Sequence, residues 1–373
     1  MKRTPQLLAL LGVLMVLSCT RMPTGPRTEV VVHGTITGPS GDPTRDTWVV
    51  FVPQETVLQD SVFDTYTQTG VDGTYSLPLL PGDYELRIHP TEHREWLGYS
   101  NLVRVSEDHD QFDYAFHGHH VTGRLLDPTG AVITYGSVEA TIEAPHSSSA
   151  ASGVEQGTFS LLLPSGTYSL TGQAGPRSGI PSRTFPGVSI ASDTTLDLAL
   201  TGFPVQGTVI GPDGAPMPGA QVEIWPGEVL TDDTGAYLIY ADAGVHAIRC
   251  FPPYGHEEIL FRTVARNVTG PTTVDFDLRG VTWSGTVRFE GTLDPADGYY
   301  VEALTLPPDN RYAYLRTGPD GEFHLILEAN RTYDLHVHSP HADPPIYEAR
   351  YRATADTTFE IVIPPDTPPP PSP

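Results

Sequence analysis

One set of motifs occurs four times along this chain and constrains the fold more than any other feature. An opening motif centres on a glycine, and its copies lie 89, 84 and 78 residues apart: Gly34, Gly123, Gly207 and Gly285. A second glycine stands two residues before an aromatic ring in each copy: Gly73, Gly157, Gly235 and Gly321. Nine residues later comes a residue that tolerates positive φ: Gly82, Gly166, Gly244 and Asn330. A regular period of this kind indicates repeated structural units.

The residues around these turns alternate between apolar and polar, which predicts strands with one buried face. In the first copy Tyr75 and Leu77 lie on one face of their strand, and Tyr84 and Leu86 lie on the face of the next strand that is turned toward them. We count about seven such strands in each copy of about 80 residues, and a second sheet is the simplest cover for an apolar sheet face. The 36 glycines and 37 prolines supply turns and exclude long helices. Each copy is therefore predicted to be a small β-sandwich.

The third copy carries the most complete motif run. Its segments are Gly207-Thr208-Val209, Asp213-Gly214-Ala215-Pro216, Gly219-Ala220-Gln221-Val222 and Asp232-Asp233-Thr234-Gly235-Ala236-Tyr237. This run resembles the carboxypeptidase regulatory-like domain, a transthyretin-like (prealbumin-like) sandwich. The other copies lack the Gly-Ala pair, and the fourth has Asn330 in place of the last turn glycine. The resemblance implies an all-β chain of four seven-stranded Greek-key-type sandwiches. It implies no activity, because this family serves as an accessory module on peptidases, transporters and surface proteins.

The repeat gives the domain organisation. We predict sandwiches at residues 30–117, 118–200, 201–279 and 280–364, followed by a disordered proline-rich tail at residues 365–373. Only two to four residues join the last strand of one copy to the first strand of the next. Linkers this short do not let domains move freely, so neighbouring sandwiches are expected to touch at restricted angles.

The N-terminus has the features of an export signal. Lys2 and Arg3 precede an apolar run from Leu7 to Leu17, too short to span a bilayer as a helix. The ending Val16-Leu17-Ser18-Cys19 resembles the lipobox of bacterial lipoproteins, which implies cleavage of a signal peptide at residues 1–18, lipidation (palmitate) of Cys19, and a tether over residues 19–29. The Thr20 that follows implies outer-membrane sorting. The alternative is an ordinary secretory signal with a chance cysteine.

Charge and cysteine content narrow the possible functions. Lysine and arginine total 21 against 45 acidic residues, a net charge of −24, so a nucleic-acid partner is not expected. Lys2 is the only lysine, which leaves the mature chain without a Schiff-base lysine or a Lys–Asn isopeptide crosslink. Once Cys19 is lipidated, Cys250 has no partner for a disulfide, and its place in the alternation predicts a buried, inert thiol.

Three histidines of the fourth copy suggest a metal site. If the strands on either side of Asn330 pair as a hairpin, His324 lies opposite His336, with His338 two residues further on. Cross-strand neighbours have Cβ atoms roughly 5 Å apart, so these imidazoles could share a divalent transition metal. The alternative is that histidine merely suits an exposed strand face. No other cofactor is expected.

Four aromatic residues stand outside the repeated core pattern and suggest a platform for sugars. They are Trp96, Tyr99, Tyr312 and Tyr314. Exposed rings stack on sugar faces, although packing beneath a loop explains them equally well. No nucleophile elbow, Walker loop, zincin motif or convincing catalytic triad is present, so we do not expect an enzyme.

These observations leave three functions open. The leading hypothesis is a non-catalytic, lipid-anchored cell-envelope protein that acts as a spacer or as an adhesion or binding rod. It would bind the membrane through its N-terminal lipid and contact envelope proteins or glycans. The second is a carbohydrate-binding accessory lipoprotein of an outer-membrane uptake system. The third is a metal-binding protein or metalloenzyme built on His324, His336 and His338.

Overall fold

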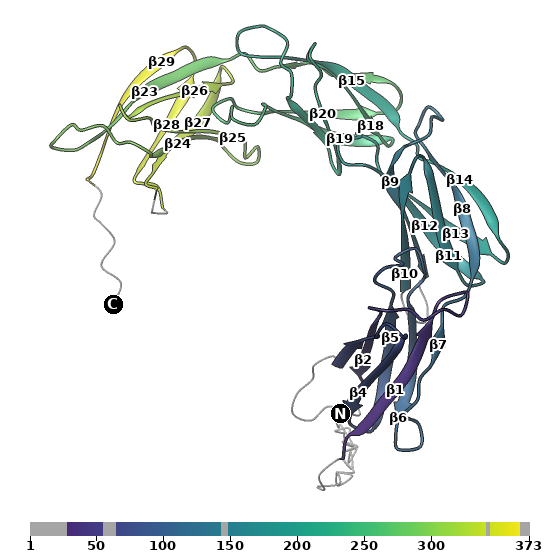
Figure 1. The fold of residues 1–373 in the computed structure, drawn as a ribbon. Helices are drawn as coiled ribbons and strands as arrows, with labels where there is room; N and C mark the ends of the chain where they lie inside the picture. The colour runs from purple at the N-terminus through teal and green to yellow at the C-terminus, as the bar shows by residue number, and fades with distance from the viewer. Residues whose placement is uncertain (1–27, 55–64, 143–147, 341–343, 366–373) are drawn as a thin grey trace, which may run out of the picture.

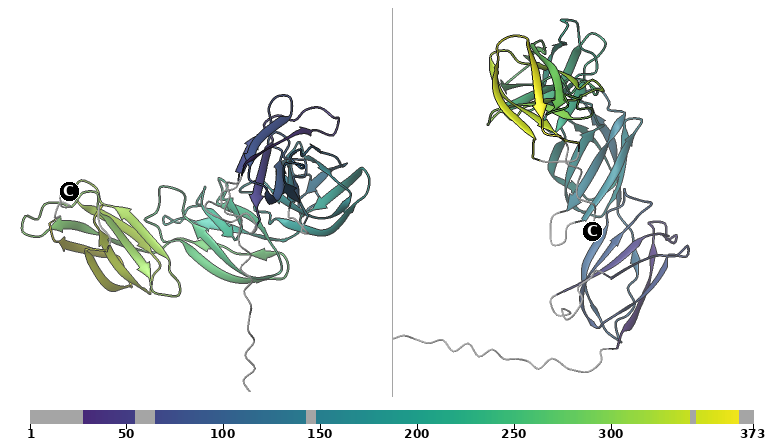
Figure 2. Two further views of the ribbon diagram at one scale, coloured as in Figure 1. Left: turned by 90° about the horizontal axis from the view of Figure 1, so that it is seen from below. Right: turned by 90° about the vertical axis from the view of Figure 1, so that its left-hand side faces the viewer.

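The computed structural model describes residues 28–54, 65–142, 148–340 and 344–365. In these residues every regular element is a β-strand, and no helix could cross a membrane. The strands form four units that follow one another along an arc (Figure 1), and two further views show the same succession (Figure 2). The predicted all-β fold is confirmed.

The first unit consists of two sheets packed face to face. Its strands are β1 (Val30–Thr37), β2 (Trp48–Pro53), β3 (Thr65–Gln68), β4 (Thr74–Leu79), β5 (Gly82–His89), β6 (Tyr99–Val105) and β7 (Tyr114–Ala115). One sheet has the order β4-β1-β7 and the other the order β3-β2-β5-β6. The last strand runs parallel to the first, whereas the other pairs are antiparallel.

The third and fourth units repeat this plan. The third contains β15 (Phe203–Ile210), β16 (Gln221–Ile224), β17 (Gly227–Leu230), β18 (Ala236–Ala241), β19 (Gly244–Phe251), β20 (Arg262–Val268), β21 (Thr272–Thr273) and β22 (Phe276–Asp277). The fourth contains β23 (Val281–Phe289), β24 (Tyr300–Thr305), β25 (Tyr312–Arg316), β26 (Glu322–Leu327), β27 (Arg331–His338), β28 (Tyr347–Ala353) and β29 (Thr357–Ile363). Their four-stranded sheets have the orders β17-β16-β19-β20 and β25-β24-β27-β28. The strands before and after the turns at Gly244 and Asn330 (β18 and β19, and β26 and β27) therefore lie in different sheets and do not pair.

The second unit differs because its two layers form one sheet. Its strands are β8 (His119–Leu126), β9 (Tyr135–Ile142), β10 (Ser148–Glu155), β11 (Thr158–Leu163), β12 (Gly166–Ala174), β13 (Arg183–Ile190) and β14 (Thr194–Ala199). The order is β13-β12-β9-β10-β11-β8-β14, because β10 pairs with both β9 and β11. Gln156 and Gly157 both have positive φ at the β10–β11 turn, as a tight hairpin requires.

A buried threonine explains why the other units keep two separate sheets. Thr231 Oγ1 donates to the carbonyl of Met217 at 2.6 Å and accepts the N–H of Ala220 at 2.9 Å. Thr69 and Thr317 make the same pair of bonds in the first and fourth units. Each of the three stands four residues before the second motif glycine, where the second unit has Gly153. Without the threonine, that chain segment continues as β10 into the hairpin.

Each unit has its own hydrophobic core. The four clusters are built mainly from inward-facing strand residues, and Phe51, Leu161, Ile239 and Trp283 are almost completely buried, one in each cluster. The alternation of buried and exposed positions along the strands confirms the predicted core faces.

Close approach of the last strand explains the glycine of the opening motif. A Cβ atom on Gly34, Gly123, Gly207 or Gly285 would overlap the carbonyl group of the residue that faces it across the parallel pair. Any larger residue at these positions would push the last strand away from the sheet.

Candidate functional site: docking loops, ligand clefts and a histidine cluster

The loop between β5 and β6 of the first unit docks into the second unit. Leu97 donates its N–H to the carbonyl of Leu162 at 3.2 Å, and Leu162 donates its own to the carbonyl of Glu95 at 2.9 Å. On the other side, Ala151 of β10 donates to the carbonyl of Arg94 at 2.7 Å. The loop thus adds a short extra strand between β10 and β11. The Leu97 side chain is buried in the hydrophobic core of the second unit.

The β19–β20 loop of the third unit docks into the fourth unit in the same way. Leu260 donates to the carbonyl of Ile326 at 2.9 Å, and Ile326 donates to the carbonyl of Glu258 at 2.8 Å. Tyr314 of β25 donates to the carbonyl of Glu257 at 2.9 Å. Leu260 is completely buried in the core of the fourth unit. A residue of one unit therefore completes the core of the next.

The two docking loops share a local turn. His93 contacts Glu95 and His256 contacts Glu258, each with Nδ1 3.0 Å from the carboxylate oxygen Oε1. The third residue after each histidine donates its N–H back to the histidine carbonyl. The common sequence is His-x-Glu-x-Leu at residues 93–97 and 256–260. This pattern lies outside the repeated glycine motifs and so was not predicted, although alignment of the two loops reveals it.

The joint between the second and third units has fewer backbone hydrogen bonds of this kind. Gly179, in the loop between β12 and β13, accepts the N–H of Tyr240 of β18 at 2.7 Å. Arg177 lies 3.4 Å from Glu228, measured from Nε to the carboxylate oxygen. By this hydrogen bond Gly179 corresponds to Glu95 and Glu258, not to the buried leucines, and a Cβ atom at Gly179 would overlap the Val229 side chain. This joint is held by the backbone and an exposed ion pair rather than by a buried side chain.

The receiving residue occupies the same repeat position in three units, and the first unit departs from it. Leu162, Tyr240 and Ile326 each stand five residues after the second motif glycine, and each donates its backbone N–H to a docking loop. The equivalent residue on β4 of the first unit is Pro78, which has no N–H. Proline is tolerated on an edge strand when its missing N–H would point away from the sheet. The first unit therefore cannot receive a docking loop by this hydrogen bond.

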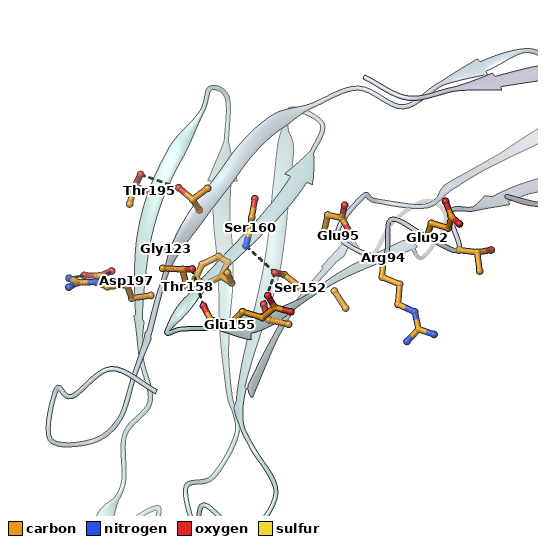
Figure 3. Close-up of a pocket in the computed structure, with 16 residues that line it drawn as sticks. Glu92, Arg94, Glu95, Gly123, Ser152, Glu155, Thr158, Ser160, Thr195 and Asp197 are labelled. Atoms are coloured by element: carbon orange, nitrogen blue, oxygen red, sulfur yellow. Dashed lines mark hydrogen bonds and ion pairs between the residues drawn. The ribbon is translucent and has the colours of Figure 1, made fainter. Parts of the chain in front are cut away.

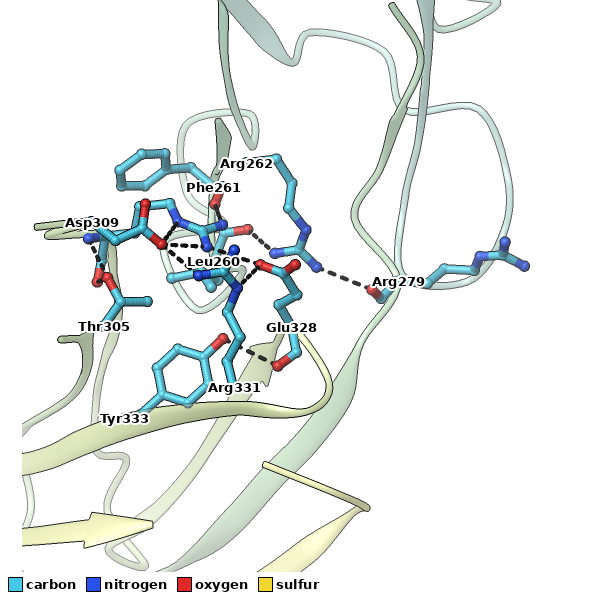
Figure 4. Close-up of polar contacts among 10 residues, drawn as sticks. Leu260, Phe261, Arg262, Arg279, Thr305, Asp309, Glu328, Arg331 and Tyr333 are labelled. Carbon is cyan, nitrogen blue, oxygen red and sulfur yellow. Dashed lines mark hydrogen bonds and ion pairs between the residues drawn. The ribbon is translucent and has the colours of Figure 1, made fainter. Parts of the chain in front are cut away.

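A buried arginine network reinforces the joint between the third and fourth units (Figure 4). Arg311, almost fully buried, donates to Asp309 at 2.7 Å and to Glu328 at 2.9 Å, and it reaches the carbonyl of Phe261 in the third unit at 3.2 Å. Arg262 donates to the carbonyls of Leu260 at 2.8 Å and Arg279 at 3.0 Å. Burial lowers the pKa of Arg262 from its usual value. Arg311 thus ties the docking loop to the β24–β25 loop and the β26–β27 turn of the fourth unit, and Arg262 ties it to the segment that leads into β23.

A wide polar groove lies beside the joint between the first two units (Figure 3). It has a volume of about 1080 Å³ and takes side chains from the docking loop and from the second unit, among them Arg94, Glu95, Ser152 and Glu155. Phe159, the one aromatic residue of its lining, is buried. The groove therefore offers no ring on which a sugar could stack.

A smaller, aromatic cleft lies at the joint between the third and fourth units. It measures about 320 Å³, and its aromatic lining consists of Phe251, Tyr254, Phe261, Tyr312 and Tyr314. Tyr254 is fully exposed and Tyr312 is 46% exposed. The Phe251 and Phe261 rings stack at 4.7 Å between centroids. Gln221, Glu223 and Glu257 supply polar groups at the same cleft. Two of the four predicted stacking residues thus lie in one cleft.

The other two predicted stacking residues pack inside the first unit. Trp96 stacks on His93 with ring centroids 3.9 Å apart and lies 5.2 Å from Phe116. Tyr99 lies 4.3 Å from Tyr114, again between ring centroids. These half-buried rings fill the space beneath the docking loop, so packing accounts for them.

The predicted register of the histidine cluster is wrong. His324 lies on β26, where it is exposed and pairs with Ser284 of β23, whereas His336 lies on β27 in the other sheet. The turn at Asn330 carries the chain from one layer of the sandwich to the other instead of forming a paired hairpin. Strands in opposite layers turn their outward faces away from each other, which separates His324 from His336 and His338.

His336 and His338 do lie together, and a glutamate takes the place expected for His324. The strand pairing puts Glu302 of β24 beside His336 and Glu348 of β28 on its other side. The Nε2 atom of His338 is 3.6 Å from Glu302, and that of His336 is 3.7 Å from Glu348. Both Nε2 atoms are buried and have no hydrogen-bond partner among the residues that the structure describes.

Cys19 and the tail at residues 366–373 lie outside the described residues. Cys250 is completely buried, and burial raises the pKa of its thiol to about 12. This confirms the predicted burial of Cys250.

Comparisons with known proteins give little beyond these observations. No family model matches the chain, and no curated protein matches it. Among solved structures, the TIE protein of Bacillus anthracis is 10% identical over 92% of this chain and 76% of its own, with a TM-score of 0.20. A streptococcal ancillary pilin is 13% identical over 66% and 99%, with a TM-score of 0.21, and the pilus adhesin SpaC of Lactobacillus rhamnosus GG is 11% identical over 91% and 43%, with a TM-score of 0.22. Likenesses this weak carry no argument about function.

Proposed function

We propose that this chain is a non-catalytic, exported spacer or binding rod of the bacterial cell envelope. The observation that carries the proposal is the docking of each of the first three units into the next, through loops centred on Leu97, Gly179 and Leu260. A chain that only linked independent domains would not need a residue of one unit in the core of another. Such joints maintain a fixed curvature, which is the property that a spacer needs.

We also propose where the protein is located and where its domains begin and end. Cys19 carries the lipid anchor, residues 19–29 form the tether, and the rod stands on the outer membrane. The folding units extend over residues 30–117, 118–200, 201–279 and 280–364 and are of the carboxypeptidase regulatory-like type. The strongly negative charge keeps such rods soluble and apart from one another.

Small-angle X-ray scattering of the mature chain tests the rigid rod. We expect one curved shape whose maximum dimension stays the same between low and high salt. Buried leucines and backbone hydrogen bonds hold the first and third joints, and a backbone hydrogen bond holds the second. A broad distribution of dimensions, as for four domains on free linkers, would contradict the proposal.

Membrane attachment is tested separately in bacterial cells. The wild-type chain is expected to incorporate radioactive palmitate and to sediment with the outer membrane. The Cys19→Ser variant should do neither, and Cys250→Ser serves as the control that keeps both properties. Palmitate incorporation that survives Cys19→Ser would refute the anchor.

The aromatic cleft favours a second candidate function, capture of a glycan by an accessory lipoprotein. Exposed rings of Tyr254 and Tyr312 beside carboxylates suit a sugar, which presents both C–H faces and hydroxyl groups. Binding of the mature chain to a glycan array should fall in Tyr312→Ala. Tyr135→Ala, which removes an exposed ring of the second unit, is the matched control. Equal binding by both variants, or none by the wild type, would exclude this function for the cleft.

A further inference from the structure

We infer that the outer face of the fourth unit holds a site for one divalent transition metal ion, with zinc as the reference ion. Its ligands are Nε2 of His336, Nε2 of His338 and a carboxylate oxygen of Glu302. Each of these three residues has one potential ligand atom within 4.8 Å of those of the other two. Glu302 replaces His324 in the predicted ligand set, because His324 lies on a strand of the other sheet.

The distances suit coordination better than direct hydrogen bonding. Two ligands of a tetrahedral zinc ion, each about 2.0–2.1 Å from the metal, are separated by about 3.3 Å. The His338–Glu302 distance of 3.6 Å is beyond a hydrogen bond but close to this separation. A small rotation of these side chains would close the set around an ion.

The two imidazole nitrogens give the second argument. Buried polar atoms in proteins are almost always hydrogen-bonded, so two unpaired ones side by side need an explanation. Within the described part of the chain both Nε2 atoms are buried without a hydrogen-bond partner, and the two rings lie 5.9 Å apart between centroids. A metal ion would satisfy both nitrogens at once, and imidazole with carboxylate is a ligand set typical of zinc and neighbouring metals.

The scaffold and the local charge favour the same ion. Glu302 lies on β24 and His336 and His338 on β27, which are adjacent, hydrogen-bonded strands. Their side chains are only about one-fifth to one-quarter exposed, so they are already partly ordered. Glu348, on the next strand and 65% exposed, has its carboxylate 3.7 Å from His336 and is free to turn in as a fourth ligand or to hold a bound water. A second carboxylate also strengthens the attraction for a dication.

Isothermal titration of the metal-free mature chain with ZnCl₂ tests the site. We expect one zinc ion per chain and an upward shift in the melting temperature of the fourth unit, because the ion binds only the folded form. Loss of a residue that merely supports a metal ligand typically costs about 10–100-fold in affinity, so His338→Ala and Glu302→Gln should each weaken binding by at least about tenfold. His324→Ala is the matched control, since it removes an exposed strand histidine of the same unit, and it should leave binding unchanged.

Two further measurements keep the test decisive. In a chain whose other three tryptophans are replaced by phenylalanine, Trp283 fluorescence shows whether each variant keeps the folded core of the fourth unit. Glu302→Gln, which preserves side-chain size, serves if an alanine variant unfolds. Cobalt(II) titration should give visible absorption bands of a four-coordinate site in the wild type that disappear in Glu302→Gln. Absence of stoichiometric zinc, or binding that His338→Ala leaves intact, would overturn the inference.

Discussion

Replacing Leu260 by alanine should destabilise a unit to which Leu260 does not belong. The side chain extends from the β19–β20 loop of the third unit and is fully buried in the core of the fourth. Removal of a buried leucine side chain typically costs about 2–5 kcal/mol, from lost transfer free energy and the cavity left behind. For a unit of this size the whole free energy of unfolding is roughly 4–12 kcal/mol, so the loss is large.

The assay follows the fourth unit through Trp283, in a chain whose other three tryptophans, Trp48, Trp96 and Trp225, are replaced by phenylalanine. Trp283 is buried in that core, so its emission shifts when the fourth unit unfolds. A loss of about 3 kcal/mol corresponds to a fall in melting temperature of roughly 12–24 °C for a domain of 60–100 residues. Val245→Ala, an exposed position on β19 of the third unit, is the control and should cost less than about 1 kcal/mol.

The location of the effect decides between two interpretations. If docking completes the fourth core, Leu260→Ala lowers the Trp283 transition while the control does not. If the transition of Leu260→Ala stays at the wild-type temperature, the core of the fourth unit is complete without the docking loop, and the loop only lies against it.

Three further outcomes follow from the structure. Cys250 should resist alkylation at pH 8 in the folded chain and react in denaturant, since burial raises its thiol pKa to about 12; rapid native labelling would contradict its burial. Arg311→Met should destabilise the fourth unit by about 2 kcal/mol in urea, because Asp309 and Glu328 lose a shared partner; an unchanged midpoint would argue against the network. Hydrogen bonds from the Thr234 side chain and the following backbone lower the pKa of Asp232, so its stabilising effect is present above about pH 4 and disappears as the pH falls further. Asp232→Ala should therefore reduce the dependence of the third unit's melting temperature on acid pH. The same slope in the variant and the wild type would exclude this effect.

Much of the fold could be predicted because its causes are local. Alternating side chains give the strands and their buried faces, and the turn glycines give the ends of the strands. The repeat gives the number of units. These features depend on the geometry of single strands and turns, which neighbouring residues determine by themselves.

The candidate sites could be predicted only in part. The outward positions of His336 and His338 follow from alternation along one strand. Their neighbours Glu302 and Glu348 lie on two other strands, 34 residues before and 12 residues after His336 in the sequence. Tyr312 and Tyr314 were found because they lie outside the core pattern, whereas Tyr254 and Phe261 join them only through the contact between two units.

The four small β units and their apolar interiors follow from the amino-acid pattern, because that pattern is periodic and local. Three features emerge only from the folded chain: the sheet that each strand joins, the entry of Leu97 and Leu260 into the core of the next unit, and the lack of an N–H for docking at Pro78 of the first unit. The physical reason is that sheet order and docking depend on pairings between distant segments. A strand's own pattern shows which face is buried but not which neighbour covers it.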